Sequence, residues 1–184
     1  MQVVPLPLSL VVMKPHFDDV IDDLDLLYCL ARFDPIVIGT PPLGIALESS
    51  DIDIACSASD LEQFGDVARK EFAHLRRFSL RYVEHLSEPA MLATFVSSGW
   101  EIELFCQRLR TEEQWGVRHF RVEERLLSLE PNLRREVLRL KRLGFKTEPA
   151  FAKLLQLSGD PYEAILSLES KTDNELLEIA KRPF

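Results

Sequence analysis

The periodicity of apolar residues changes near residue 108, and this change constrains the fold more than any other feature of the chain. Up to that point, apolar runs and polar–apolar alternation predict strands at 36–38, 50–56, 78–85, 91–96 and 100–106. Helical spacing there predicts helices at 16–33 and 61–75. Beyond it the patterns are helical, at 112–129, 133–143, 149–157 and 174–181. We therefore expect an α+β protein in which residues 1–108 form a sheet-containing core and residues 109–184 form a helical unit packed on it.

The charge balance limits the partners of the chain. It holds 30 acidic and 22 basic residues. This net charge of −8 argues against a protein that coats bulk nucleic acid. The apolar residues 1–13 are too few to span a bilayer and lack the basic region of a signal peptide, so we expect a disordered or extended start and no membrane segment. Three widely spaced cysteines without a CxxC pair fit a reducing cytoplasm.

Two aspartates carry the clearest chemical signal. In the predicted strand 50–56, Asp51 and Asp53 lie on one face, while Ile52 and Ile54 point into the core. Carboxylates on one edge of a strand repel each other unless a cation lies between them. A hard divalent ion such as Mg²⁺ binds carboxylate oxygens together with phosphate oxygens. The pair therefore indicates a metal site suited to phosphoryl transfer.

The turn before this strand favours phosphate binding. Gly39 and Thr40 close the apolar strand 36–38, so backbone N–H groups and the Thr40 hydroxyl are available to phosphate oxygens. Gly44 lets the chain turn back toward the aspartates. Pro41-Pro42 removes two N–H donors, and Leu43 adds no positive charge. Additional cations for a polyphosphate must then come from the helical unit.

These residues resemble a known signature. Gly39-Thr40-x-x-x-Gly44 followed by Ser50-Asp51-Ile52-Asp53-Ile54 resembles the Gly-Ser…Asp-x-Asp pattern of the DNA polymerase β-like nucleotidyltransferase superfamily. Over residues 33–166 the chain is also similar to DUF4269, a bacterial family of domains of unknown function. That wider similarity includes Glu103-Leu104-Phe105, Gln114, Arg118-His119, Glu123, Lys141, Lys146-Thr147-Glu148-Pro149 and Gly159-Asp160-Pro161-Tyr162.

The resemblance implies a polymerase β-like nucleotidyltransferase fold, a short mixed β-sheet flanked by helices with a helical C-terminal part. It implies a third catalytic carboxylate on a later strand, for which we choose Glu103, with Glu101 left open as the alternative. One or two Mg²⁺ ions would lie among Asp51, Asp53 and Glu103. Residues expected to bind the phosphates of an NTP are Gly39, Thr40, Ser50, Lys141 and Lys146.

The implied reaction moves a nucleoside monophosphate from an NTP to an acceptor hydroxyl. The acceptor is left open among a protein side chain, a tRNA end and a small molecule. The alternatives are a catalytically silent nucleotide-binding or partner-binding module of the same fold, related to toxin–antitoxin pairs, and a structural protein without a metal. On the predicted helix 112–129, His119 and Glu123 share a face, and a histidine in such a place more often has a structural role.

Overall fold

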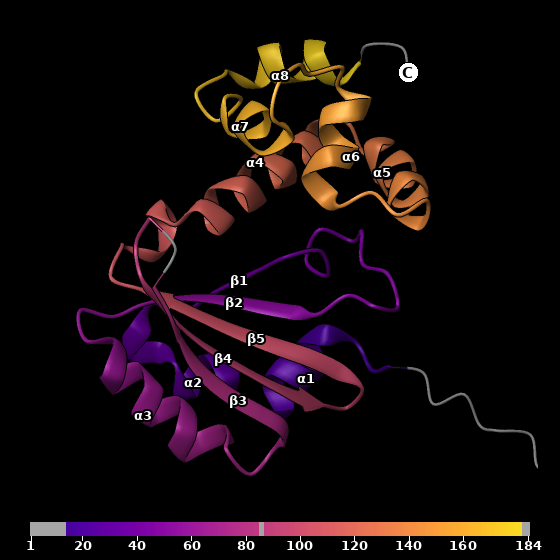
Figure 1. The fold of residues 1–184 in the computed structure, drawn as a ribbon. Coiled ribbons are helices and arrows are strands. Elements are labelled where there is room, and N and C mark those ends of the chain that lie inside the picture. Colours follow the sequence, from indigo (N-terminus) through magenta and orange to yellow (C-terminus); the bar gives the residue numbers. More distant parts are fainter. Residues whose placement is uncertain (1–13, 85–86, 182–184) are drawn as a thin grey trace, which may run out of the picture.

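The computed structural model describes residues 14–84 and 87–181 (Figure 1). The start predicted for residues 1–13 therefore lies outside the described residues, as does the last residue of the predicted strand 78–85. None of the described helices is both long and apolar enough to cross a membrane.

The chain forms one five-stranded mixed sheet with the order β1-β2-β5-β4-β3. The strands are β1 Ile36–Ile38, β2 Ile52–Ser57, β3 Arg76–Val83, β4 Ala90–Ser97 and β5 Trp100–Gln107. Strands β2 and β5 run parallel, and the other neighbours are antiparallel. The five predicted strands and the mixed sheet are thus confirmed. The parallel pair joins segments that are 50 residues apart in sequence, because α3 (Leu61–Phe72), β3 and β4 lie between them in the chain.

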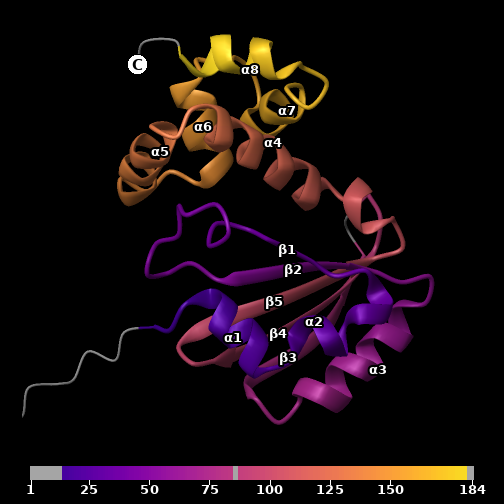
Figure 2. The same ribbon diagram turned by 180° about the vertical axis from the view of Figure 1, so that it is seen from behind.

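The two faces of the sheet differ in what covers them. Ile52, Ile54, Ile102 and Leu104 are fully buried in the core that the sheet forms with the N-terminal helices. Helices α1 (Phe17–Asp23), α2 (Leu26–Cys29) and α3 lie on that face, in front of the sheet in Figure 2. In Figure 1 the opposite face of β5, β4 and β3 is turned to the viewer, and no helix crosses it. The alternation in the sequence therefore sends the acidic residues to this open face.

The single helix predicted for 16–33 is wrong, because the segment breaks into three pieces. Helix α1 ends at Asp23, α2 holds four residues, and a 3₁₀ turn covers Ala31–Phe33. Asp25 has φ 50° and Asp34 has φ 49°, a left-handed conformation that aspartate tolerates better than most residues and that no continuing helix permits. Leu26 and Phe33, the neighbours of these aspartates, are still buried, so the apolar spacing of the segment resembles that of one continuous helix.

The C-terminal part consists of helices. Their bounds are α4 Trp115–Leu129, α5 Leu133–Arg142, α6 Thr147–Leu154, α7 Pro161–Leu166 and α8 Asp173–Ala180. Helix α7 is absent from the sequence prediction, which assigns only a turn to 159–162. The turn starts the helix, since the Asp160 carboxylate accepts hydrogen bonds from the N–H groups of Tyr162 (3.0 Å) and Glu163 (3.1 Å) and Pro161 occupies the first helical position.

Two hydrophobic clusters divide the molecule. One lies between the sheet and α1–α3, and the other is formed by the C-terminal helices. Leu43 and Ile45, from the loop between β1 and β2, are buried in the helical cluster. The division into units at residue 108 stays a prediction, and the β1–β2 loop, residues 39–50, packs with the helices although it lies far before that boundary.

Candidate active site

The open face of the parallel strand pair holds the candidate carboxylates. Asp53 of β2 is directly opposite Glu103 of β5, and neighbouring strands are about 4.8 Å apart. Asp51 immediately precedes β2 on the same face. Glu101 shares this face too, but it lies one alternate position back along β5 and is exposed. The strand register therefore pairs Asp53 with Glu103 rather than with Glu101.

Burial and mutual repulsion disturb the titration of these acids. Burial, followed by the charges of Asp51 and Glu103, raises the pKa of Asp53 to about 7. Burial and the charge of Asp51 also raise the pKa of Glu103, while Arg81 opposes that shift. Bringing negative charges together on a half-buried surface is unfavourable, and a cation would reverse the sign of that interaction.

The donor types fit a hard divalent cation, because the cluster offers oxygen ligands only. Within residues 14–84 and 87–181, however, no group of three or more His, Cys, Asp or Glu side chains is close enough to form a ready-made metal site. The backbone holds Asp53 and Glu103 as neighbours, and the exposed Asp51 must turn toward them to complete a set of three. The three-carboxylate metal site thus stays a prediction.

Gly39 determines how the β1–β2 loop meets Asp53. Its φ of +81° favours glycine, and a Cβ atom placed on it would overlap Oδ2 of Asp53. The carboxylate of Asp53 therefore occupies the space that a side chain at position 39 would need. This close approach brings the predicted phosphate-binding turn and the predicted metal ligand together.

Two predicted phosphate ligands hold the loop closed on itself. The Thr40 hydroxyl donates to Oγ of Ser50 at 3.0 Å, and the same Ser50 oxygen accepts from the Leu47 N–H at 2.9 Å. Phosphate binding by either hydroxyl stays a prediction, and it would have to share these atoms with the loop.

The two predicted lysines have different surroundings. Lys141 is 9% exposed, and its ammonium donates to the carbonyl of Ile45 at 2.9 Å. Arg134 makes a similar contact, because its Nε donates a hydrogen bond to the carbonyl of Leu43 at 3.1 Å. The ammonium of Lys141 therefore fastens the β1–β2 loop to the helices. Lys146 is exposed just before α6, and its side chain makes no hydrogen bond or ion pair with the part of the chain that the structure describes.

Replacing Lys141 by Met should lower the free energy of unfolding by about 1–3 kcal/mol, because the buried carbonyl of Ile45 loses its donor. The exposed Lys146→Met variant serves as the matched control and should change stability by less than about 0.5 kcal/mol. Urea denaturation of both variants measures the difference. Equal effects would contradict an anchoring role for Lys141.

A pocket of about 440 Å³ adjoins the carboxylates. It lies between the open sheet face and the start of α4, and its wall includes Asp53, Glu103, Phe105, Gln114 and Trp115. Gln114 is 1% exposed and donates from Nε2 to the carbonyls of Cys56 (2.6 Å) and Leu109 (3.3 Å), whereas its Oε1 has no partner among the described residues. Trp115 is 52% exposed. The sequence prediction assigned neither residue to the site, although both stand at the junction of the two parts of the chain.

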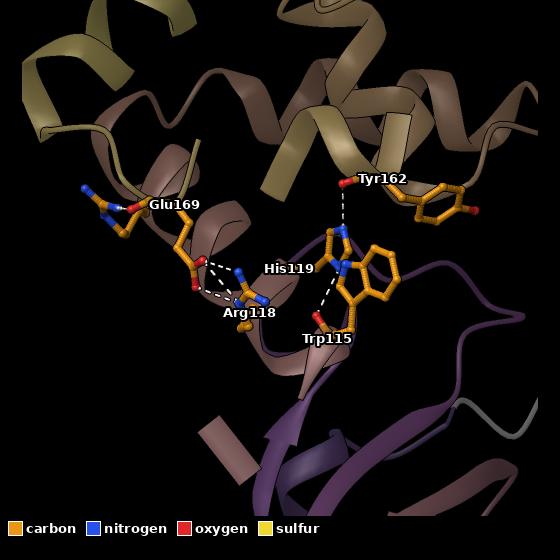
Figure 3. A network of polar contacts seen from close by, with 6 residues as sticks. Trp115, Arg118, His119, Tyr162 and Glu169 are labelled. Atoms are coloured by element: carbon orange, nitrogen blue, oxygen red, sulfur yellow. Dashed lines mark hydrogen bonds and ion pairs between the residues drawn. The ribbon is translucent and has the colours of Figure 1, made fainter. Parts of the chain in front are cut away.

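His119 contacts two backbone carbonyls and does not line the pocket beside the carboxylates. Its Nδ1 lies 3.0 Å from the carbonyl of Trp115 and its Nε2 lies 2.9 Å from the carbonyl of Tyr162 (Figure 3). Beside it, Arg118 forms an ion pair with Glu169. These contacts join the first turn of α4 to α7 and the segment after it. The helix that forms one wall of the pocket is therefore held by the other C-terminal helices.

Glu123, one turn further along α4, is buried. Its Oε1 has no hydrogen-bond partner within the described residues, and burial raises the pKa of this carboxyl well above its ordinary value. Neither His119 nor Glu123 lines the pocket.

The architecture is shared with solved nucleotidyltransferases. A cytoplasmic RNA terminal U-transferase matches with a TM-score of 0.53 and 19% identity, covering 79% of this chain and 43% of that one. The Cid1 poly(U) polymerase matches with a TM-score of 0.54 and 16% identity, covering 78% of this chain and 48% of that one. GLD-2, in its complex with RNP-8, matches with a TM-score of 0.51 and 14% identity, covering 88% of this chain and 73% of that one. The chain spans less than half the length of the first two proteins. At these identities the similarity shows the fold, which is that of the polymerase β-like nucleotidyltransferases.

No curated protein matches the chain. The family model of the domain of unknown function DUF4269 matches residues 19–168, which include the whole sheet, the β1–β2 loop and the helices from the second half of α1 to α7. The chain therefore belongs to the DUF4269 family.

Proposed function

We propose that the protein is a Mg²⁺-dependent nucleotidyltransferase that moves a nucleoside monophosphate from an NTP to an acceptor hydroxyl. The observation that carries this proposal is the alignment of Asp53 with Glu103 on parallel strands, with the Asp53 carboxylate packed against Gly39 of the β1–β2 loop. A turn suited to bind phosphate, placed against two aligned carboxylates, supports the proposal because metal-assisted phosphoryl transfer uses such groups.

Asp51, Asp53 and Glu103 would hold the metal, which, when bound, neutralises charge on the phosphates and lowers the pKa of the acceptor hydroxyl. In the transfer, the hydroxyl oxygen forms a bond to the α-phosphorus, and the bond from that phosphorus to its bridging oxygen breaks. Pyrophosphate leaves with the electron pair, and the hydroxyl proton passes to a carboxylate of the cluster and then to water. Backbone N–H groups at Gly39 and Thr40 would orient the phosphates, and the pocket beside Asp53 would hold the nucleoside.

Calorimetry of NTP binding with and without Mg²⁺ tests the metal site. Wild-type protein should bind an NTP in a Mg²⁺-dependent way, and the Asp51→Asn/Asp53→Asn variant should lose that dependence. Glu103→Gln and Glu101→Gln form a matched pair on one strand. If the register assigns the third ligand correctly, Glu103→Gln weakens binding about 10–100-fold and Glu101→Gln has a much smaller effect. Equal binding by wild type and the double variant would rule out this site.

Several classes of molecule could supply the acceptor hydroxyl, and each can be tested. The named neighbours act on RNA ends as an RNA terminal U-transferase and a poly(U) polymerase, which makes an RNA 3′ end one class to test. The net charge of −8 disfavours long nucleic acid, so a protein side chain, a tRNA end and a small molecule belong in the same test.

A catalytically silent nucleotide-binding or partner-binding module is the second candidate. It is favoured by the β1–β2 loop, where Pro41 and Pro42 lack N–H groups and Thr40 and Ser50 bond to each other. Incubation of the protein with each α-labelled NTP and cell lysate separates the two functions. An enzyme leaves a labelled acceptor that Asp53→Asn does not produce, and a silent module binds NTP and leaves none.

A further inference from the structure

The direction from which an acceptor reaches the carboxylates follows from the order of the strands. In phosphoryl transfer the attacking and leaving oxygens are roughly in line across phosphorus. The loop that would hold the triphosphate lies on the β1 side of Asp53, since Gly39 follows β1 directly and packs against that aspartate. The opposite side of Asp53 is occupied by β5, β4 and β3 in that order. An acceptor hydroxyl that attacks in line therefore arrives over β5 from the direction of β4 and β3.

The open face of β4 and β3 offers hydrogen-bond donors and positive charge. Across the sheet from Glu103 lies Thr94 of β4, and beyond it Ser79 of β3. One alternate position along β3, Arg81 stands on the same face, and Arg76 lies on this face near the start of the strand. Both arginines are exposed, and neither makes a hydrogen bond or ion pair with residues 14–84 or 87–181. As far as the described residues go, their guanidinium groups are available to bind another molecule.

We infer that the open face of β4 and β3 is the acceptor site, and that Arg81, assisted by Arg76, binds an anionic group of the acceptor. The inference rests on the proposed nucleotidyltransferase function. Strand β3 is two strand spacings, about 10 Å, from β5, and this spacing sets the scale of the distance between the anionic group and the reacting hydroxyl. A phosphate or phosphodiester suits a guanidinium, which donates two parallel hydrogen bonds to such an anion.

Charged residues on an edge strand also prevent edge-to-edge pairing, and β3 is an edge strand. That role needs charge along the edge and has no preference for its sign. Both arginines are positive in a chain of net charge −8, and both lie on the sheet face that also carries the carboxylates. Arg81 lies on the same sheet face as Glu103, two strands away, and forms no ion pair with it in residues 14–84 and 87–181. An acceptor that brings its own anion between them would satisfy the guanidinium without neutralising the catalytic carboxylate.

The test uses the full chain saturated with Mg²⁺ and an α,β-methylene NTP, and follows the Nε–Hε resonance of Arg81 by NMR. Two anionic probes are titrated: glycerol 3-phosphate for a small-molecule source of the phosphate, and the dinucleotide ApA for an RNA end. Glycerol and adenosine are the neutral controls. We expect one anionic probe to shift the resonance at concentrations where its neutral control does not. Calorimetric titration of the same probe, which does not depend on the Arg81 resonance, compares the variants with wild type. Arg81→Gln should bind the probe about tenfold more weakly, and Arg81→Lys should lose less.

Arg69→Gln removes the same charge from α3, which covers the other face of the sheet, and should leave probe binding unchanged. A response to ApA assigns the phosphate to a nucleic-acid end, and a response to glycerol 3-phosphate assigns it to a small molecule. The inference is overturned if neither anion shifts the Arg81 resonance, if the neutral probes act equally, or if Arg81→Gln binds like wild type. Calorimetry of the NTP analogue keeps the two proposals apart. Failure of wild type to bind it would remove the proposed function as well, whereas normal analogue binding without a probe response would remove the acceptor site alone.

Discussion

Wild-type protein without Mg²⁺ is expected to lose about 3 kcal/mol more unfolding free energy between pH 5 and pH 8 than the Asp53→Asn variant. The pKa of Asp53 is about 7 in the folded protein, against 3.8 for an ordinary aspartate. The folded state therefore holds this proton more tightly than the unfolded chain. The resulting stability is fully present below about pH 4, declines as the pH rises, and is lost above about pH 7. An asparagine carries no charge at either pH, so the variant lacks this part of the decline.

Urea denaturation of both proteins at pH 5 and pH 8 measures the effect. Glu103 and Glu123 also have raised pKa values and are present in both proteins, so the difference between the two reports Asp53 together with its interaction with Glu103. Glu101→Gln, an exposed acid on the same face, is the control and should follow wild type. Added Mg²⁺ should stabilise wild type at pH 8 and leave Asp53→Asn unchanged. Parallel pH profiles for wild type and Asp53→Asn would show that Asp53 titrates normally.

Gly39→Ala is expected to weaken Mg²⁺-dependent NTP binding about 10–100-fold, because its methyl group takes the place of the Asp53 carboxylate and turns that ligand away. The positive φ adds a backbone penalty of about 1–2 kcal/mol to folding. Gly44→Ala is a matched control in the same loop. Gly44 has φ +69°, yet the nearest atom to its added Cβ is Nε of Arg134 at 3.6 Å, an ordinary contact.

Both alanine variants should therefore lose similar backbone stability, and only Gly39→Ala should lose the metal-dependent binding. Denaturation and calorimetry on the same preparations give the two quantities. Full NTP affinity in Gly39→Ala would mean that the position of the Asp53 carboxylate does not matter for the ligand.

The strands could be predicted because this sheet has one buried face and one open face. Under that condition each strand alternates in polarity, and the alternation also placed Asp51 and Asp53 correctly on the open side. The break at Asp25 could not be predicted, because a left-handed aspartate leaves no mark on the apolar spacing. Helix α7 is only six residues long, too short for a period to show, and its capping residues look like those of a turn.

The candidate site was predictable in its residue types and less so in its geometry. The choice of Glu103 over Glu101 depends on the register between two strands that are not consecutive in the chain, which no local pattern encodes. Lys141 shows that the partner of a side chain is equally hard to predict. A lysine that binds phosphate and a lysine that binds a backbone carbonyl have the same sequence signature, and the partner here lies 96 positions away. The pocket lined by Gln114 could not be predicted, because it forms between the sheet and the start of α4.

The burial of Leu43 and Ile45 among the C-terminal helices has a consequence for how this domain can be rebuilt. A chimaera that exchanges the helices at residue 108 would keep a loop shaped for the wrong core, and two aliphatic side chains would face mismatched partners. A transplant should therefore carry residues 39–50 together with the helices. The segment that touches Asp53 would then be inherited with the C-terminal half, so the new sheet would have to supply an aspartate that fits against Gly39.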